Sequence, residues 1–155
     1  MKTFMISAAA LAATATPALA GEFTGPRVEV TAGVDDASRG VRTKDVQYGV
    51  GVGYDVQVGK LVAGVETGVD NVFDRRNINV GARLGVAVND GVLLYTKAGY
   101  ANWKQAVNRK YEGLRLGAGV EARLAGPFYG KVEYRHVDYG AVKTNGGLVG
   151  FGARF

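Results

Sequence analysis

The sequence predicts an all-β protein, an eight-stranded antiparallel up-and-down transmembrane β-barrel. Three observations indicate this class. Apolar and polar residues alternate with a period of two along most of the chain, charges keep to one of the two resulting faces, and the chain ends on an aromatic residue within such an alternating segment. Successive side chains of a strand point to opposite faces, so the pattern describes strands with one apolar and one polar side.

The first residues have the features of a secretory signal. Lys2 supplies a positive charge, an apolar stretch follows from Phe4 to Ala15, and Ala18-Leu19-Ala20 forms a small-residue cleavage site. We therefore expect residues 1–20 to be a cleaved signal peptide and residues 21–155 to form the barrel domain. The chain contains no cysteine, which excludes disulfides and thiolate metal sites.

Period-2 segments separated by turn residues recur along the rest of the chain. Strands are expected near residues 27–34, 46–56, 60–70, 77–88, 92–102, 114–124, 128–138 and 147–155. Turns rich in Gly, Asn, Asp and Pro at 57–59, 89–91 and 125–127 alternate with longer polar loops at 35–45, 71–76, 103–113 and 139–146. Short turns at one end and longer loops at the other are typical of a membrane barrel, with both termini on the short-turn side.

The distribution of charge indicates which face meets lipid. One face of the predicted strands carries no formal charge, apart from Asp138 at a strand end, and the opposite face carries many. A charge facing lipid costs about 2–4 kcal/mol at the bilayer midplane, so we expect the charged face to line the lumen. The expected lumen charge network is Glu29, Asp55, Glu66, Arg83, Lys97, Arg115, Glu121, Arg123, Lys131, Glu133, Arg135 and Arg154.

Inward glycines and outward aromatics complete this interpretation. Eight strands enclose a space just wide enough for side chains, and inward glycines make room for long charged groups, among which Arg83 is expected to meet Glu66. Aromatic residues gather near the strand ends, as the two interfaces of a bilayer select. The expected aromatic girdle is Tyr54 and Phe128 on the turn side and Tyr48, Tyr100, Trp103, Tyr134 and Tyr139 on the loop side.

The signal peptide, the eight alternating strands and the terminal G-F-G-A-R-F of residues 150–155 resemble the small bacterial outer-membrane β-barrels of the OmpA membrane-domain, OmpX and opacity-protein type. The resemblance implies a monomer in the outer membrane of a Gram-negative cell, in contact with outer-membrane lipid and lipopolysaccharide. It also implies that Phe155 is an assembly signal for the outer-membrane assembly machinery. Adhesins, anchors, small channels and lipid-modifying enzymes share this fold, so the resemblance indicates architecture rather than activity.

We expect a structural or surface-interaction role, without catalysis, cofactor or metal. Mixed-sign charge and the absence of a nucleic-acid motif argue against nucleic acid as a partner. A first alternative is a small channel. A second is a lipid-active enzyme with Ser38 as nucleophile and His136 as base, near Asp138. The predicted loops are rich in cations, which predicts electrostatic contact with anionic lipopolysaccharide or host polyanions: Arg39, Arg42, Lys44, Arg75, Arg76, Lys104, Arg109, Lys110 and Lys143.

Overall fold

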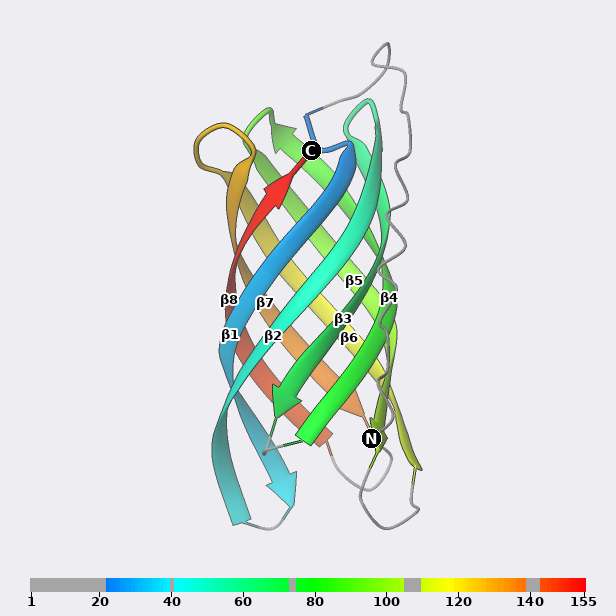
Figure 1. Ribbon diagram of the computed structural model, residues 1–155, viewed down its shortest axis with the longest axis vertical. Helices are drawn as coiled ribbons and strands as arrows, with labels where there is room; N and C mark the ends of the chain where they lie inside the picture. The colour runs from blue at the N-terminus through cyan, green and yellow to red at the C-terminus, as the bar shows by residue number, and fades with distance from the viewer. Residues whose placement is uncertain (1–21, 40, 73–74, 105–109, 139–142) are drawn as a thin grey trace, which may run out of the picture.

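The computed structural model describes residues 22–39, 41–72, 75–104, 110–138 and 143–155. They form a closed barrel in which each strand pairs antiparallel with its neighbours in sequence, and β8 pairs back onto β1 (Figure 1). The predicted eight-stranded antiparallel barrel is therefore confirmed. The predicted signal peptide lies outside the described residues. The strands are β1 (Gly25–Arg39), β2 (Val41–Val58), β3 (Leu61–Val72), β4 (Arg75–Asn89), β5 (Val92–Lys104), β6 (Lys110–Arg123), β7 (Phe128–Asp138) and β8 (Lys143–Arg154).

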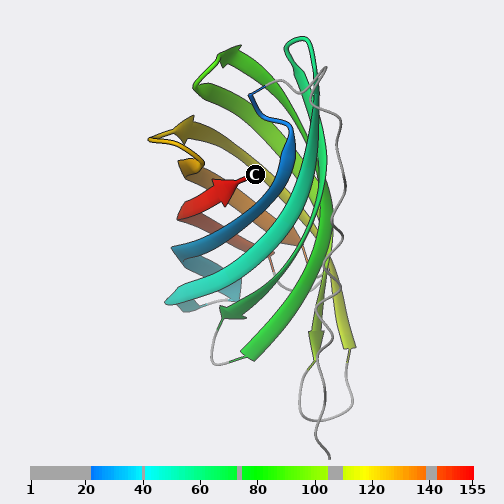
Figure 2. The same ribbon diagram turned by 45° about the horizontal axis from the view of Figure 1, so that its top comes forward.

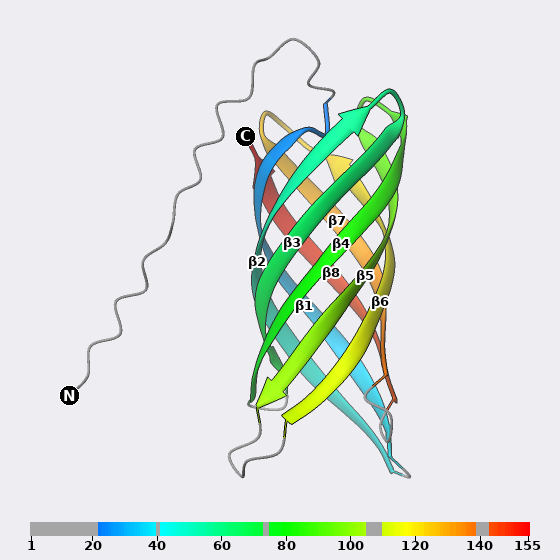
Figure 3. The same cartoon turned by 90° about the vertical axis from the view of Figure 1, so that its right-hand side faces the viewer.

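The three short connections lie at one end of the barrel, together with the start of β1 and the end of β8 (Figure 3). We call this end the turn side and the opposite end the loop side. Gly59 and Gly126 occupy two of these turns with φ of 60° and 57°, a left-handed conformation that glycine adopts without steric cost. The predicted turns at 57–59, 89–91 and 125–127 are confirmed, each within a residue or two.

The loop side differs from the prediction, because strands replace most of the expected loops. The prediction of a loop at Asp35–Asp45 is wrong. β1 and β2 run side by side (Figure 2) and stay paired as far as Arg39 and Val41. Their hairpin reaches beyond the end of β3 (Figure 1), whereas β8 stays paired with β1 as far as Ser38. The other three predicted loops are also shorter than expected. Beyond a bilayer both faces of a strand meet water, so the apolar alternation disappears although ladder hydrogen bonding continues.

The burial pattern is that of a barrel with lipid outside. The outward residues predicted for each strand are exposed or half-exposed apart from Ala153, and they include large apolar side chains such as Val80 and Leu84, which are 59% and 66% exposed. Polar and charged residues make up most of the buried set instead. A water-soluble barrel would show the inverse arrangement. Among the described residues, no helix is long and apolar enough to cross a membrane.

The seam between the first and last strands is closed by backbone hydrogen bonds, and aromatic packing joins the last strand to β7. β1 and β8 pair from Arg27 with Arg154 to Ser38 with Lys143, and the Phe155 N–H donates to the Pro26 carbonyl at 2.9 Å. Outside the barrel, the ring of Phe151 stacks on that of Phe128 with centroids 5.5 Å apart. The start of β1 and the end of β8 are thus joined on the turn side.

Candidate functional site

The inside of the barrel is filled by charged side chains that meet across the lumen. Among the described residues, seven carboxylates and seven cations point inward, and each carboxylate has an oxygen within 3.5 Å of at least one cation nitrogen. The members are Glu29, Asp35, Asp55, Glu66, Asp70, Glu121 and Glu133, with Arg27, Arg83, Lys97, Arg115, Lys131, Arg135 and Arg154. We call this set the lumen network, and it divides into three layers.

The turn-side layer is a closed ring of two arginines and two carboxylates. Arg83 donates to Asp55 Oδ1 and to Glu121 Oε2, both at 2.9 Å. Arg154 donates to the same two carboxylates at 2.6 Å each. The Arg83 guanidinium also lies over the Tyr95 ring, 5.1 Å from its centroid. Each carboxylate is therefore held by at least two cations, as the desolvation of buried charge requires.

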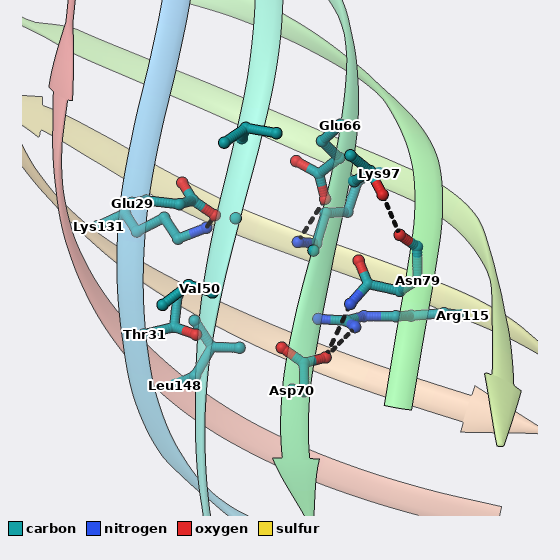
Figure 4. Close-up of a pocket in the computed structure, with 14 residues that line it drawn as sticks. Glu29, Thr31, Val50, Glu66, Asp70, Asn79, Lys97, Arg115, Lys131 and Leu148 are labelled. Carbon is teal, nitrogen blue, oxygen red and sulfur yellow. Dashed lines mark hydrogen bonds and ion pairs between the residues drawn. The ribbon is translucent and has the colours of Figure 1, made fainter. Parts of the chain in front are cut away.

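The middle layer is a larger ring in which three cations and three carboxylates alternate. Figure 4 shows two of its contacts, between Glu29 and Lys131 and between Glu66 and Lys97. The Arg27 Nε also donates to Asp55 at 3.1 Å, which joins this ring to the turn-side layer. In order around the ring, the contacts are Arg27–Glu66 at 2.6 Å, Glu66–Lys97 at 2.9 Å, Lys97–Glu133 at 2.8 Å, Glu133–Lys131 at 3.5 Å, Lys131–Glu29 at 2.6 Å and Glu29–Arg27 at 3.0 Å.

The loop-side layer is a chain rather than a ring. Asp70 accepts from Arg115 at 2.6 Å and lies 3.5 Å from Arg135, which donates to Asp35 at 2.7 Å. Two neutral amides complete the layer: Asn79 donates to Asp70 at 3.0 Å, and Gln47 donates to Asp35 at 3.1 Å. This layer therefore contains two cations and two carboxylates. The turn-side layer also contains two of each, and the middle layer contains three of each. Each layer is neutral.

The packing of the network leaves little free space. A cavity between the middle and loop-side layers has a volume of about 20 Å³, which is room for a single water molecule (Figure 4). Inward glycines make the dense packing sterically possible, because a Cβ at Gly53 would lie 2.8 Å from the guanidinium carbon of Arg27. A Cβ at Gly150 would lie equally close to Cε of Lys131. The arrangement holds every carboxylate against a cation.

The prediction of inward charges misplaced one residue, missed three and paired one arginine with the wrong carboxylate. Arg123 was expected in the lumen, but its side chain is 38% exposed and pairs with Glu22 at the turn side. The prediction did not include Arg27, Asp35 and Asp70, although each lies two residues from an inward-facing residue of its own strand and so faces the lumen. The expected Arg83–Glu66 contact is also absent among the described residues, where Arg83 binds Asp55 and Glu121.

An apolar cluster closes the turn end of the lumen, and the sequence reasoning missed it. It contains Phe23, Val62, Ala87, Leu93 and Tyr95, all buried. Val62, Ala87 and Leu93 lie within a few residues of the short turns, on the inward face. The cluster could have been predicted from the apolar character of these three inward positions, because the inward positions deeper in the lumen are charged.

The girdle positions lie on the outer surface where the structure describes them. Tyr48, Tyr100 and Tyr134 are exposed near the loop side, and two of them bond polar neighbours: Asn71 donates to the Tyr48 hydroxyl, and Tyr134 donates to Asn145 at 2.9 Å. Phe128 and Phe155 are exposed on the turn side, and Tyr54 is half-buried. Tyr139 and the side chain of Trp103 lie outside the described part of the chain.

The alternative catalytic pair is not brought together by the fold. Ser38 lies on β1 and His136 on β7, and β8 runs between these two strands. Two strand spacings separate their backbones by about 10 Å. The His136 ring instead contacts Asn145 of β8, with 2.7 Å between Nδ1 and Oδ1. Within the described residues, no group of three or more His, Cys, Asp or Glu side chains is arranged to hold a metal ion.

Comparison with solved structures identifies small membrane barrels with the same architecture. Neisserial surface protein A matches with a TM-score of 0.60 at 17% identity, over 85% of this chain and 98% of its own. Ail of Yersinia pestis, solved in complex with the heparin analogue sucrose octasulfate, matches with a TM-score of 0.59 at 16% identity, over 85% and 99%. The outer membrane enzyme PagL matches with a TM-score of 0.53 at 14% identity, over 82% and 99%.

These neighbours include surface proteins and an enzyme, so they show the shared fold and not one common activity. Comparison with curated protein sequences gave no significant match. A family model, by contrast, matches residues 6–155, nearly the whole chain. The protein therefore belongs to the outer membrane protein beta-barrel domain family and is an outer-membrane β-barrel of the Gram-negative type.

Proposed function

We propose that this protein is a monomeric, non-catalytic and non-conducting barrel that holds a basic hairpin at the cell surface for contact with anionic saccharides. The observation that carries the proposal is the β1–β2 hairpin. β2 pairs with β1 as far out as Val41, whereas within the described residues its pairing with β3 begins only at Tyr48. Residues 41–47 therefore extend past the loop-side girdle, by roughly 20 Å along the strand at about 3.3 Å per residue.

The charge of the hairpin tip supports an anionic partner. Residues 38–44 contain Arg39, Arg42 and Lys44 and no acidic residue. Lys143 of β8 is paired in register with Ser38, which adds a fourth cation beside the tip. Sulfate and phosphate groups on saccharides are the ligands that such cations attract. Lipopolysaccharide and host glycosaminoglycans both carry them, and the heparin analogue bound by Ail belongs to the same chemical class.

Binding to immobilised heparin tests this proposal. Neutralising two tip cations with Arg42→Gln and Lys44→Gln is expected to weaken binding about 3- to 10-fold, because each exposed charge contact contributes up to about 1 kcal/mol. Elution should then occur at lower salt. Lys60→Gln is the matched control, because Lys60 is an exposed cation in the turn on the opposite side of the barrel. Equal loss in the control variant would contradict a role for the hairpin.

The lumen network supports a non-conducting barrel. Its three layers are neutral, and two cavities beside its middle and loop-side layers have volumes of only about 20 and 10 Å³, so no continuous aqueous path is expected. Purified protein in planar bilayers should therefore give at most small and infrequent current steps. Large and stable steps from the unmodified protein would favour the small-channel alternative. The enzyme alternative would require lipid turnover that is lost on Ser38→Ala.

Delivery to the outer membrane belongs to the same proposal. We take residues 1–20 as the cleaved signal peptide and the last strand as the segment that the outer-membrane assembly machinery recognises. Phe155 is 71% exposed at the end of β8, where a partner can reach its ring. The exposed apolar band above it suits contact with outer-membrane lipid.

A further inference from the structure

The segment that precedes β1 enters the turn-side mouth of the barrel. Phe23 is completely buried, although it lies before the first strand and only three residues after the predicted cleavage site. Its ring packs in the apolar cluster with Val62 of β3, Ala87 of β4, and Leu93 and Tyr95 of β5. These inward residues, near the turns, form an apolar seat of the size of one aromatic side chain.

Polar contacts fix the same segment to strands around the mouth. The Phe23 N–H donates to Gln57 Oε1 at 2.9 Å, and the Phe23 carbonyl accepts from Arg154 at 2.7 Å. The Thr24 hydroxyl accepts from the Gln57 N–H at 3.0 Å, and Glu22 pairs with Arg123. The segment thus bonds to residues at the turn-side ends of β2, β6 and β8, and it crosses the mouth rather than following one strand.

The seat lies directly against the turn-side layer of the lumen network. Arg154, which holds Asp55 and Glu121, also places its guanidinium 5.8 Å from the centroid of the Phe23 ring. Phe23 therefore covers part of this layer at the mouth, beside a turn-side cavity of about 120 Å³ that Arg154 also lines. Removing its ring would leave an opening through which water could reach them, since polar groups favour a hydrated cavity.

Gly25 gives the segment its direction. Its φ of 126° is a conformation that other residues rarely adopt, and a Cβ at this position would collide with the Phe155 carbonyl. The chain therefore turns into the mouth at a glycine that also touches the end of the last strand. This joint connects the segment to the barrel wall.

We propose that residues Glu22–Thr24 form a tethered plug, with Phe23 as the stopper, that closes the turn-side mouth of the barrel. The plug is independent of any surface partner, because it lies at the end opposite the β1–β2 hairpin. Its function is to keep water and solutes on the turn side away from the lumen network. The seat accepts one aromatic ring, supplied by the chain itself.

Thiol accessibility in the folded barrel tests the plug, and the absence of native cysteine makes single-cysteine variants unambiguous. Leu93→Cys places a thiol in the seat, and Asp90→Cys places one in an exposed turn nearby. A membrane-impermeant, charged methanethiosulfonate is the probe. With Phe23 present, Leu93→Cys should react at least about 100-fold more slowly than Asp90→Cys, because modification requires local opening.

Adding Phe23→Ala to Leu93→Cys should speed the reaction by about tenfold or more, whereas Phe23→Leu should retain most of the protection. Retained heat-modifiable gel migration confirms that each variant is a folded barrel. Rapid modification of Leu93→Cys with Phe23 present, or protection unchanged by Phe23→Ala, would overturn the proposal. If Phe23→Ala does not fold, Phe23→Val takes its place: faster modification of Leu93→Cys than with Phe23 or Phe23→Leu supports the plug, and an unchanged rate rejects it.

Discussion

Replacing Arg83 with leucine is expected to destabilise the folded barrel by about 3–5 kcal/mol, because it leaves buried carboxylates with too few cations. Arg83 is 1% exposed and donates three hydrogen bonds, two to Asp55 and one to Glu121. Its removal leaves the turn-side layer with two anions and one cation. Equilibrium urea unfolding of the refolded protein in lipid vesicles measures the change in free energy.

Arg123→Leu is the matched control for this experiment. The substitution is chemically identical, but the Arg123 side chain is 38% exposed and its ion pair with Glu22 is open to water. Exposed pairs contribute about 0–1 kcal/mol, so little change is expected. Adding Glu121→Gln to Arg83→Leu restores the charge balance of the layer and should recover part of the lost stability. If Arg83→Leu and Arg123→Leu cost the same, the lumen network is hydrated rather than dry.

An arginine in place of Leu84 is expected to destabilise the barrel by about 2–4 kcal/mol, because it places a cation against acyl chains near the midplane. Leu84 is 66% exposed on the outer face. Val80, on the same face, pairs with the girdle residue Tyr100, and Leu84 lies four residues further toward the turn side. At about 2.6 Å of depth per residue in a tilted strand, Leu84 is roughly 10 Å deeper in the membrane.

Val80→Arg provides the depth control. Its side chain can extend to the loop-side interface beside Tyr100, so its cost should fall to about 0–1 kcal/mol. Leu84→Val should leave the free energy of unfolding nearly unchanged, because lipid chains conform to either side chain. The same unfolding measurement applies to all three variants. Equal costs for arginine at positions 80 and 84 would contradict the assigned membrane depth, and no cost at position 84 would contradict lipid contact on this face.

The sequence alone predicts which residues face lipid and which face the lumen, because this depends only on the alternation of residues along each strand. Val28, Val30 and Ala32 face outward and Glu29 faces inward by the geometry of any strand, whatever its partners are. Lipid outside and charge inside then follow from the cost of exposing a charge to hydrocarbon. Period-2 alternation therefore determined the fold class, the strand number and most inward positions without knowledge of tertiary contacts.

The positions where the strands end could not be predicted as well. The alternation of apolar and polar residues that indicates a strand exists only where the two faces of the strand meet different surroundings. In water beyond the membrane, Asp35–Asp45 has polar residues on both faces and resembles a loop, yet the β1–β2 ladder continues through it. The inward Asp35 was missed for the same reason.

Tertiary structure alone decided which charges meet and what closes the mouth. Glu29 and Lys131 are 102 residues apart in sequence and 2.6 Å apart in the lumen, and Arg83 binds Asp55 rather than Glu66. Side-chain parity gives the face of a residue but not its height or angle around the barrel, which depend on strand register, tilt and closure. Phe23 belongs to no strand and carries no periodic signal, and its burial requires a seat that exists only after β3, β4 and β5 have come together in the closed barrel.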